Sequence, residues 1–468
     1  MNLRRYDKNQ IRLEPVPDPV FDSELAPVPL EDTTMEERKR KILKRMKECG
    51  LDCVIIYEDL EHGGNFEYLT GFLTRFEEAL LILHKDGRVF LVLGNENLKM
   101  AAYSRIPAKA LHFPYFSLPN QPSAHNKTLK ALLGEAGIKH GMRAGLCGWK
   151  YCEHKDSFEI PYNIVCAVHE IVGDTVENCT GMWIDPENGV RTVNNANEIA
   201  HYEFGSALAG KCVNDVVNFI QPGCSEMEAG QYLDAFGQKH NVISICAAGK
   251  RFEKANLYPS DKKIQQGDRL SVTAGFCGGL ASRAGYAVEN EAQLNANVSD
   301  YLERVAAPYY GAIAAWLENI HIGMSGGELY RLIDEVFPRK LYHWYLNPGH
   351  LCAEEEWLCS PIYENSQILL KSGMIIQIDI IPSVDGYAGA GAENGIALAD
   401  AALRKDIRKL YPRLWERLER RREYVSNVLH LSCHPEVLFL SDTVGLYRPF
   451  FLDKHRAMCL VETVNDIL

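Results

Sequence analysis

Three residues in the second half of the chain carry side chains that could move a proton or hold a positive charge. His350 follows a proline-glycine turn, Asp379 interrupts a run of isoleucines, and Glu393 stands among three glycines. An imidazole titrates near neutral pH, and a carboxylate within an apolar strand needs a partner. We therefore expect His350, Asp379 and Glu393 to be the catalytic residues of one pocket, with His350 as the proton carrier.

An internal repeat predicts the elements that position these residues. Residues 221–268 and 321–374 each begin with a glycine turn that opens a helix and end with a second glycine turn that leads into an apolar strand. Two similar half-domains should therefore face each other, with polar side chains meeting between them. The second copy spells Gly-x-Ser-x-Gly at 323–327, but Ser325 with Glu328 predicts a helix cap rather than a nucleophile.

The first part of the chain predicts an arm and a small mixed domain. Residues 1–30 are rich in proline and charge, and we expect them to stay loose or to drape over a neighbour. Thr34 and Glu37 predict a capping box for a helix over 36–49. The domain should end near residue 190, with strands over 53–57, 79–84 and 89–93.

The rest of the chain predicts a larger domain. Asn195 and Glu198 should cap a long helix that runs to about residue 219. Seven arginines between residues 400 and 425 predict an amphipathic helix whose charged face is solvated.

Composition limits the partners and the compartment. A formal net charge of -12 on 468 residues argues against nucleic acid or an anionic membrane surface as a partner. The 14 cysteines include no Cys-x-x-Cys pair, so neither a zinc site nor a disulfide framework is predicted. Apolar runs all stay below the roughly 18 residues of a membrane span. We therefore expect a cytoplasmic protein.

The order of these motifs resembles the creatinase, prolidase and aminopeptidase P family, whose fold is called pita-bread. The motifs that carry the resemblance are, in chain order, 194–199, Pro222-Gly223, the strand over 242–247, Gly267-Asp268, Gly349-His350, 370–374 and Glu393. The resemblance implies an α+β protein with an arm over 1–30, a creatinase/prolidase-like mixed α/β domain over 31–190 and a pita-bread domain over 191–468.

The resemblance also implies a metal site that this chain has partly lost. Peptidases of the family hold two divalent metals with two aspartates, one histidine and two glutamates. The aspartate positions fall on Thr273 and Arg283, and the other three fall on His350, Asp379 and Glu393. The family's additional histidines fall on Asn256 and near Trp357. A pair of hard cations needs several anionic oxygens, so we expect no metal pair.

These matches make Arg283, Trp357, Thr273 and Asn256 candidates for binding a substrate. The planar guanidinium of Arg283 could bind a carboxylate through two hydrogen bonds, and Trp357, after three consecutive glutamates, offers an aromatic face to a cationic group. Thr273 and Asn256 either contact the substrate or fill space. A guanidinium opposite two carboxylates suits a small molecule that bears both charges, so we expect a zwitterionic substrate.

Three functions are compatible with this set of residues. The main interpretation is a creatinase-like hydrolase that needs no metal or other cofactor and cleaves a C-N bond of a small zwitterionic, amino-acid-derived substrate. One alternative keeps one divalent metal on His350, Asp379 and Glu393, in an Xaa-Pro peptidase-like hydrolase or a dimethylsulfoniopropionate-type lyase. The other is a non-catalytic small-molecule-binding pseudoenzyme, in which Arg283 pairs with Asp379 or Glu393. The expected partners are a small-molecule substrate and a second copy of the chain in a homodimer.

Overall fold

The chain forms two compact units. The computed structural model describes residues 3–6, 8–121, 126–152, 154–254 and 257–461. Residues 29–192 make the amino-terminal unit, and residues 1–28 join residues 193–468 in the carboxy-terminal unit. Within the described residues, no helix combines the length and the apolar character that a membrane crossing requires.

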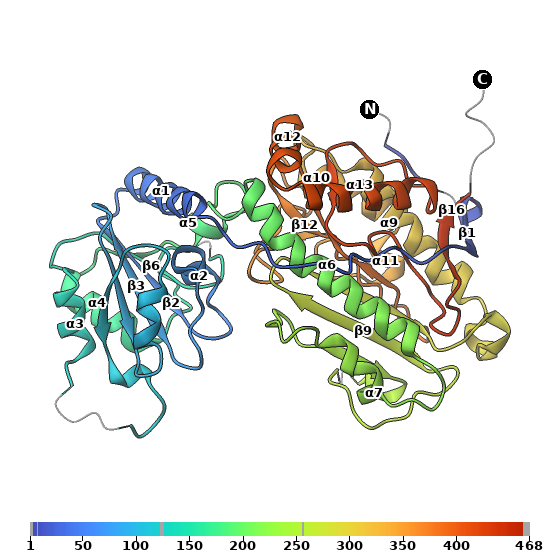
Figure 1. Ribbon diagram of the computed structural model, residues 1–468, viewed down its shortest axis with the longest axis horizontal. Coiled ribbons are helices and arrows are strands. Elements are labelled where there is room, and N and C mark those ends of the chain that lie inside the picture. Colours follow the sequence, from blue (N-terminus) through green and yellow to red (C-terminus); the bar gives the residue numbers. More distant parts are fainter. Residues whose placement is uncertain (1–2, 7, 122–125, 153, 255–256, 462–468) are drawn as a thin grey trace. The chain divides into compact units, whose positions relative to one another are not determined.

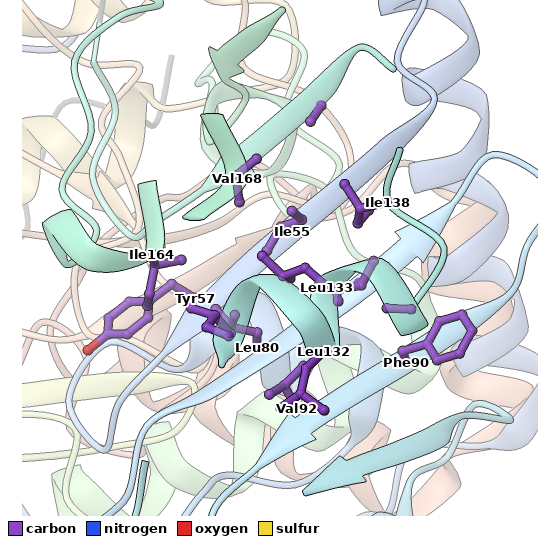
Figure 2. Packing of buried hydrophobic residues seen from close by; sticks show 14 of the residues in the cluster. Ile55, Tyr57, Leu80, Phe90, Val92, Leu132, Leu133, Ile138, Ile164 and Val168 are labelled. Atoms are coloured by element: carbon purple, nitrogen blue, oxygen red, sulfur yellow. The ribbon is translucent and has the colours of Figure 1, made fainter. Parts of the chain in front are cut away.

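The amino-terminal unit is a mixed six-stranded sheet with helices packed on it. Its strand order is β5-β4-β3-β2-β6-β7, with bounds β2 Cys53–Glu58, β3 Ala79–His84, β4 Val89–Leu93, β5 Lys109–His112, β6 Ala144–Cys147 and β7 Val176–Asn178. The helices are α1 Asp32–Cys49, α2 Gly64–Thr70, α3 Leu129–Glu135, α4 Tyr162–Val172 and α5 Gly181–Ile184. Figure 2 shows the core, in which Leu132 and Leu133 of α3 and Ile164 and Val168 of α4 pack on Ile55 and Leu80 of the sheet.

The predicted strands of this unit are confirmed, but the predicted start of its first helix is wrong. Helix α1 begins at Asp32, after Glu31, and has no side-chain cap. Thr34 lies inside the first turn and is buried, so its side chain packs into the protein instead of capping the helix. The helix ends as expected at Gly50, whose φ of 68° is accessible to a residue without a Cβ.

The carboxy-terminal unit contains two four-stranded sheets and a short ribbon. One sheet has the order β13-β10-β9-β8, from β8 Ile245–Ala248, β9 Arg269–Phe276, β10 Gly279–Tyr286 and β13 Gly391–Glu393. The other has the order β11-β12-β14-β15, from β11 His350–Leu351, β12 Ile375–Gln377, β14 Gly395–Leu398 and β15 Val437–Phe439. In the ribbon, β1 (Ile11–Pro15) lies beside β16 (Arg456–Leu460), as Figure 1 shows.

Helices complete this unit. They are α6 Ala196–Phe219, α7 Glu226–Gly230, α8 Lys250–Glu253, α9 Ala307–Asn319, α10 Gly326–Val336, α11 Arg339–Tyr342, α12 Ala401–Leu410 and α13 Pro412–Asn427. The capping box of Asn195 with Glu198 at the start of α6 is confirmed, and so is that of Ser325 with Glu328 at the start of α10.

The internal repeat is visible in backbone hydrogen bonds. Gly223 N donates to Ile264 O in the first copy, and Gly323 N donates to Leu370 O in the second. The glycines of the second turns behave alike, since Gly267 N donates to Ala287 O and Gly373 N donates to Leu398 O. All four glycines have a φ between 88° and 94°, a conformation that favours glycine. The hairpin β9-β10 therefore corresponds to the strand pair β12-β14.

Helix α6 covers one face of the hairpin β9-β10, and Figure 1 shows it running along β9. Leu208, Val213 and Val216 of the helix are buried in one cluster with Val272 and Ala281 of the strands. Even-numbered residues of β9 and odd-numbered residues of β10 therefore face the helix, because side chains alternate along a strand. The opposite face carries Thr273 and Ser282.

Candidate functional site

A histidine and three carboxyl groups lie near β11, and all of them except the partly exposed Glu356 are buried. His350 is fully buried, and its Nε2 lies 3.1 Å from Glu356 Oε1 and 3.8 Å from Asp379 Oδ2. Its Nδ1 lies 3.2 Å from the carbonyl oxygen of Leu351. Glu393 belongs to the same group, because the charges of Asp379 and Glu356 both act on it. We call His350, Glu356, Asp379 and Glu393 the acidic cluster.

Burial shifts the protonation equilibria of the acidic cluster. It raises the pKa of Asp379 from 3.8 to about 6, with a further upward contribution from Glu356 that His350 opposes. Burial and the two neighbouring carboxylates raise the pKa of Glu393 well above its usual value. The pKa of His350 is also raised, because Glu356 and Asp379 outweigh the opposing effect of burial. The cluster therefore holds more potential negative charge than one imidazolium can balance.

Two atoms of the cluster have unused hydrogen-bonding capacity. Asp379 Oδ1 and His350 Nε2 are buried and make no hydrogen bond to any described residue. The contact of His350 with Glu356 is close enough for an ion pair, but its direction does not make a hydrogen bond. Buried polar atoms without a partner are costly, so a bound water, a ligand or a reacting group can satisfy them here.

The other sheet adds a row of polar side chains. Ser282 of β10 lies opposite Thr273 of β9 on one side and opposite Glu393 of β13 on the other. Residues paired across neighbouring strands point to the same face, so these three side chains share a face. The hydroxyl groups of Thr273 and Ser282 are buried and 2.7 Å apart, which makes a direct hydrogen bond.

Arg283 adjoins Glu393, and its charge acts on that carboxyl group, but its guanidinium nitrogens donate to other oxygens. Its expected role in binding a substrate stays a prediction. Its Nη1 donates to the carbonyl oxygens of Ser282 and Glu393, and its Nη2 donates to Asn394 Oδ1 and to the carbonyl oxygen of Thr443. The side chain is on the face of β10 that α6 covers, since Arg283 is one residue from Ser282. Among the described residues it forms no ion pair with Asp379 or Glu393, although the pseudoenzyme alternative assumed one.

A side-chain bridge brings the two sheets together beside the cluster. Gln377, at the end of β12, donates from Nε2 to the carbonyl oxygen of Leu280 at 3.0 Å. Two residues later, Asp379 follows Ile378, whose backbone nitrogen donates to the carbonyl oxygen of Asn394. These bonds hold Asp379 and Glu393 near each other, although 14 positions separate them in the sequence.

Two residues near the cluster complete the comparison with the sequence predictions. Trp357 stacks on His350 with ring centroids 4.1 Å apart, and it remains 38% exposed, so part of its surface is accessible. Asn256 lies outside the described residues. Sequence reasoning considered Glu356 only as part of the acidic stretch before Trp357 that could hold a cationic group, and it assigned no role to Ser282. The run of glutamates before Trp357 indicates Glu356 as a site residue, but only the strand register identifies Ser282.

Comparison with known proteins identifies the family. The description "Metallopeptidase family M24" matches residues 201–403, and "Creatinase/Prolidase N-terminal domain" matches residues 38–150. The chain therefore belongs to the creatinase, prolidase and aminopeptidase P family, as the order of motifs predicts. The expected architecture is also confirmed: a pita-bread domain preceded by a smaller mixed domain.

Relatives are distant. An uncharacterized peptidase, YqhT, of Bacillus subtilis (strain 168) is 23% identical over 219 residues, which span 45% of this chain and 61% of that relative. An Xaa-Pro dipeptidase from Bacillus anthracis is 17% identical, with a TM-score of 0.59 over 79% of this chain and 96% of its own. Prolidase from Pyrococcus furiosus is 20% identical, with a TM-score of 0.59 over 76% of this chain and 96% of its own. The two solved structures share the fold.

The donor atoms do not fit the metal pair that the family implies. Thr273 and Ser282 present two neutral hydroxyl groups, bonded to each other, where carboxylates would be needed. In the part of the chain that the structure describes, no three His, Cys, Asp or Glu side chains are grouped so that they could hold a metal ion. The chemistry available at this site is therefore that of the acidic cluster and its neighbours.

Proposed function

We propose that the chain is a hydrolase that cleaves a C-N bond in a short peptide-like substrate, as an Xaa-Pro peptidase does. The observation that carries the proposal is the buried Asp379 Oδ1, which has no hydrogen-bond partner among the described residues and lies on the same carboxyl group that approaches His350. Membership of the M24 family and the Xaa-Pro dipeptidase among the structural relatives support a peptidase-like reaction.

The position of Arg283 favours this function over the creatinase-like interpretation. That interpretation used Arg283 to bind the carboxylate of a zwitterion, but its nitrogens already donate to three carbonyl oxygens and one amide oxygen. The attraction for a cation remains, because Glu356 and Asp379 lie beside a single histidine and both act on the nearby Glu393. The ammonium group of a peptide with a free amino terminus would balance this charge.

We assign the proton transfers to Asp379 and the stabilisation of charge to His350. With a pKa of about 6, the Asp379 carboxyl group can accept a proton from an attacking water near neutral pH and return it to the leaving nitrogen. Glu356 and the Trp357 ring hold His350 in place, 3.8 Å from Asp379. His350 would then stabilise the charge that develops as the C-N bond breaks.

The test is a substrate panel with matched analogues. Xaa-Pro dipeptides would be compared with their N-acetylated forms, with creatine-like guanidino acids and with onium carboxylates, each assayed after chelator treatment and again with added Mn²⁺. We expect turnover of free dipeptides and little turnover of the acetylated forms, which lack the ammonium group. Turnover of guanidino acids alone would restore the creatinase-like interpretation, and complete dependence on Mn²⁺ would contradict a reaction carried by side chains.

A variant pair locates the reaction in the cluster. Asp379→Asn keeps the shape of the side chain but removes the titrating group, so we expect kcat/KM to fall by about 100-fold or more. Asp385→Asn is the control, because Asp385 is exposed in the following loop. Equal activity of Asp379→Asn and the unmodified protein would remove Asp379 from the reaction.

A further inference from the structure

We propose that Thr273 and Ser282 are the two positions at which a divalent-metal centre has been lost, and that carboxylates at these two positions would restore it. The inference concerns metal binding and does not depend on the reaction proposed above. It differs from the sequence comparison, which placed one of the missing carboxylates at Arg283.

The strand register selects Ser282 rather than Arg283. A two-residue turn at 277–278 joins β9 and β10, so that Phe276 lies opposite Gly279 and Thr273 lies opposite Ser282. A one-residue difference in position moves a side chain to the other face of the sheet. Ser282 thus shares the face of Thr273 and Glu393, whereas Arg283 lies on the face toward α6.

The local bonding explains why this pair does not attract cations. The two hydroxyl groups are neutral, buried and already bonded to each other at 2.7 Å. Divalent cations such as Mn²⁺ prefer several carboxylate oxygens, and a neutral pair gives them no charge compensation. The remaining potential donors are His350, Asp379 and Glu393. Among the described residues, these three side chains are not grouped closely enough to hold a metal ion by themselves.

Three surrounding residues, His350, Asp379 and Glu393, could contribute the remaining donors of a two-metal set. Glu393 lies directly opposite Ser282, and the charge of Asp379 acts on Glu393. Two added carboxylates would complete a set of four carboxylates and one imidazole. Such a set would carry enough negative charge to bind two divalent ions, and the same charge would destabilise the protein without them.

Metal binding by the full chain tests the inference. The unmodified protein, the double variant Thr273→Asp/Ser282→Asp and the control Ser271→Asp/Ala284→Asp would be freed of metal and titrated with MnCl₂ by calorimetry and elemental analysis. The control adds the same charges to the next same-face pair of the hairpin, since Ser271 lies opposite Ala284. We expect about two Mn²⁺ ions per chain in the double variant and no stoichiometric Mn²⁺ in the other two proteins.

Thermal unfolding provides a second readout. Mn²⁺ should raise the Tm of the double variant by about 5 °C or more and should leave the other two proteins unchanged. If the double variant fails to fold alone, it would be refolded with Mn²⁺, and failure to recover folded protein would also count against the inference. Two bound ions in the unmodified protein, or a folded double variant that binds none, would overturn it.

Discussion

At the scale of single residues, the acidic cluster shows a conflict between stability and chemistry. Asp379 is 5% exposed, and the same burial that raises its pKa also makes its ionised form unfavourable in the folded protein. A residue placed only for stability would be apolar at this position, as its isoleucine neighbours are. Asp379 should therefore reduce stability at the pH at which we propose that it works.

Replacing Asp379 should stabilise the protein in a pH-dependent way. The folded-state pKa of about 6 lies above the ordinary value of 3.8, so the group favours folding below pH 3.8 and loses this contribution as the pH rises through 6. The difference corresponds to about 3 kcal/mol as an upper limit. Asp379→Asn should therefore be more stable than the unmodified protein at pH 8, by up to that amount, with little difference near pH 4. In this variant His350 still has Glu356 as a charged partner, so the imidazolium is not left uncompensated.

Urea unfolding at the two pH values measures this effect. Asp385→Asn serves as the control, because its exposed side chain should change the free energy of unfolding by less than about 0.5 kcal/mol. A lower stability of Asp379→Asn at pH 8 would show that the ionised carboxylate stabilises the fold, contrary to the expectation.

At the scale of elements, the arginine-rich segment is not the solvated helix expected from its charge. It forms two helices, because α12 ends before Pro412, which begins α13. Arg417 and Arg421 are buried, and both bind Glu203 of α6. Arg417 donates two hydrogen bonds to Glu203, at 2.9 and 2.7 Å, and Arg421 Nη1 lies 2.7 Å from it. This network attaches α13 to the helix that supports the hairpin β9-β10.

Removing the central carboxylate should destabilise the packing of α6 against α13. Glu203→Gln would remove one carboxylate from two buried guanidinium groups, which would keep Asp22 and Asp442 as their other charged partners. We expect the free energy of unfolding to fall by about 2–3 kcal/mol. Glu419→Gln, on an exposed position of α13, should change it by less than about 0.5 kcal/mol. Urea unfolding of both variants provides the measurement, and similar values for the two would contradict a structural role of the network.

At the scale of the whole molecule, the amino-terminal segment is part of the carboxy-terminal unit rather than a loose arm. β1 pairs with β16, and Tyr424 donates to the carbonyl oxygen of Pro17. Asp18 pairs with Arg448, and Asp22 pairs with Arg417 at 3.2 Å. Proline and charge in this segment thus reflect an extended chain held by specific partners. The expected homodimer and cytoplasmic location stay predictions.

Deleting residues 1–28 should weaken the carboxy-terminal unit. The deletion removes a strand and leaves the buried Arg448 without Asp18, so we expect Tm to fall by about 5 °C or more in calorimetry. The double variant Asp18→Asn/Asp22→Asn keeps the segment and removes only the charges, and its Tm should fall less. An unchanged Tm after the deletion would mean that the segment adds nothing to the stability of the unit.

The sequence by itself determined the features that depend on local patterns. Glycines at 223, 267, 323 and 373 marked the repeat because their turns require a positive φ, and the box of Asn195 with Glu198 marked the start of α6 because it involves only neighbouring residues. His350, Asp379 and Glu393 could be selected as candidate site residues because a polar side chain in an apolar or glycine-rich segment needs a binding partner or a functional role. Their shared location followed from the family resemblance.

Only the tertiary structure decided which face each side chain occupies. The turn at 277–278 sets the register that places Ser282 and Arg283 on opposite faces of the hairpin, and the motif comparison could not show this. Glu356 contacts His350 although no sequence pattern links the two residues. Arg417 and Arg421 are buried against Glu203, which is distant from both in the sequence. Such contacts depend on how strands and helices pack, so a charge in the sequence cannot show whether it faces water, a ligand or a buried partner.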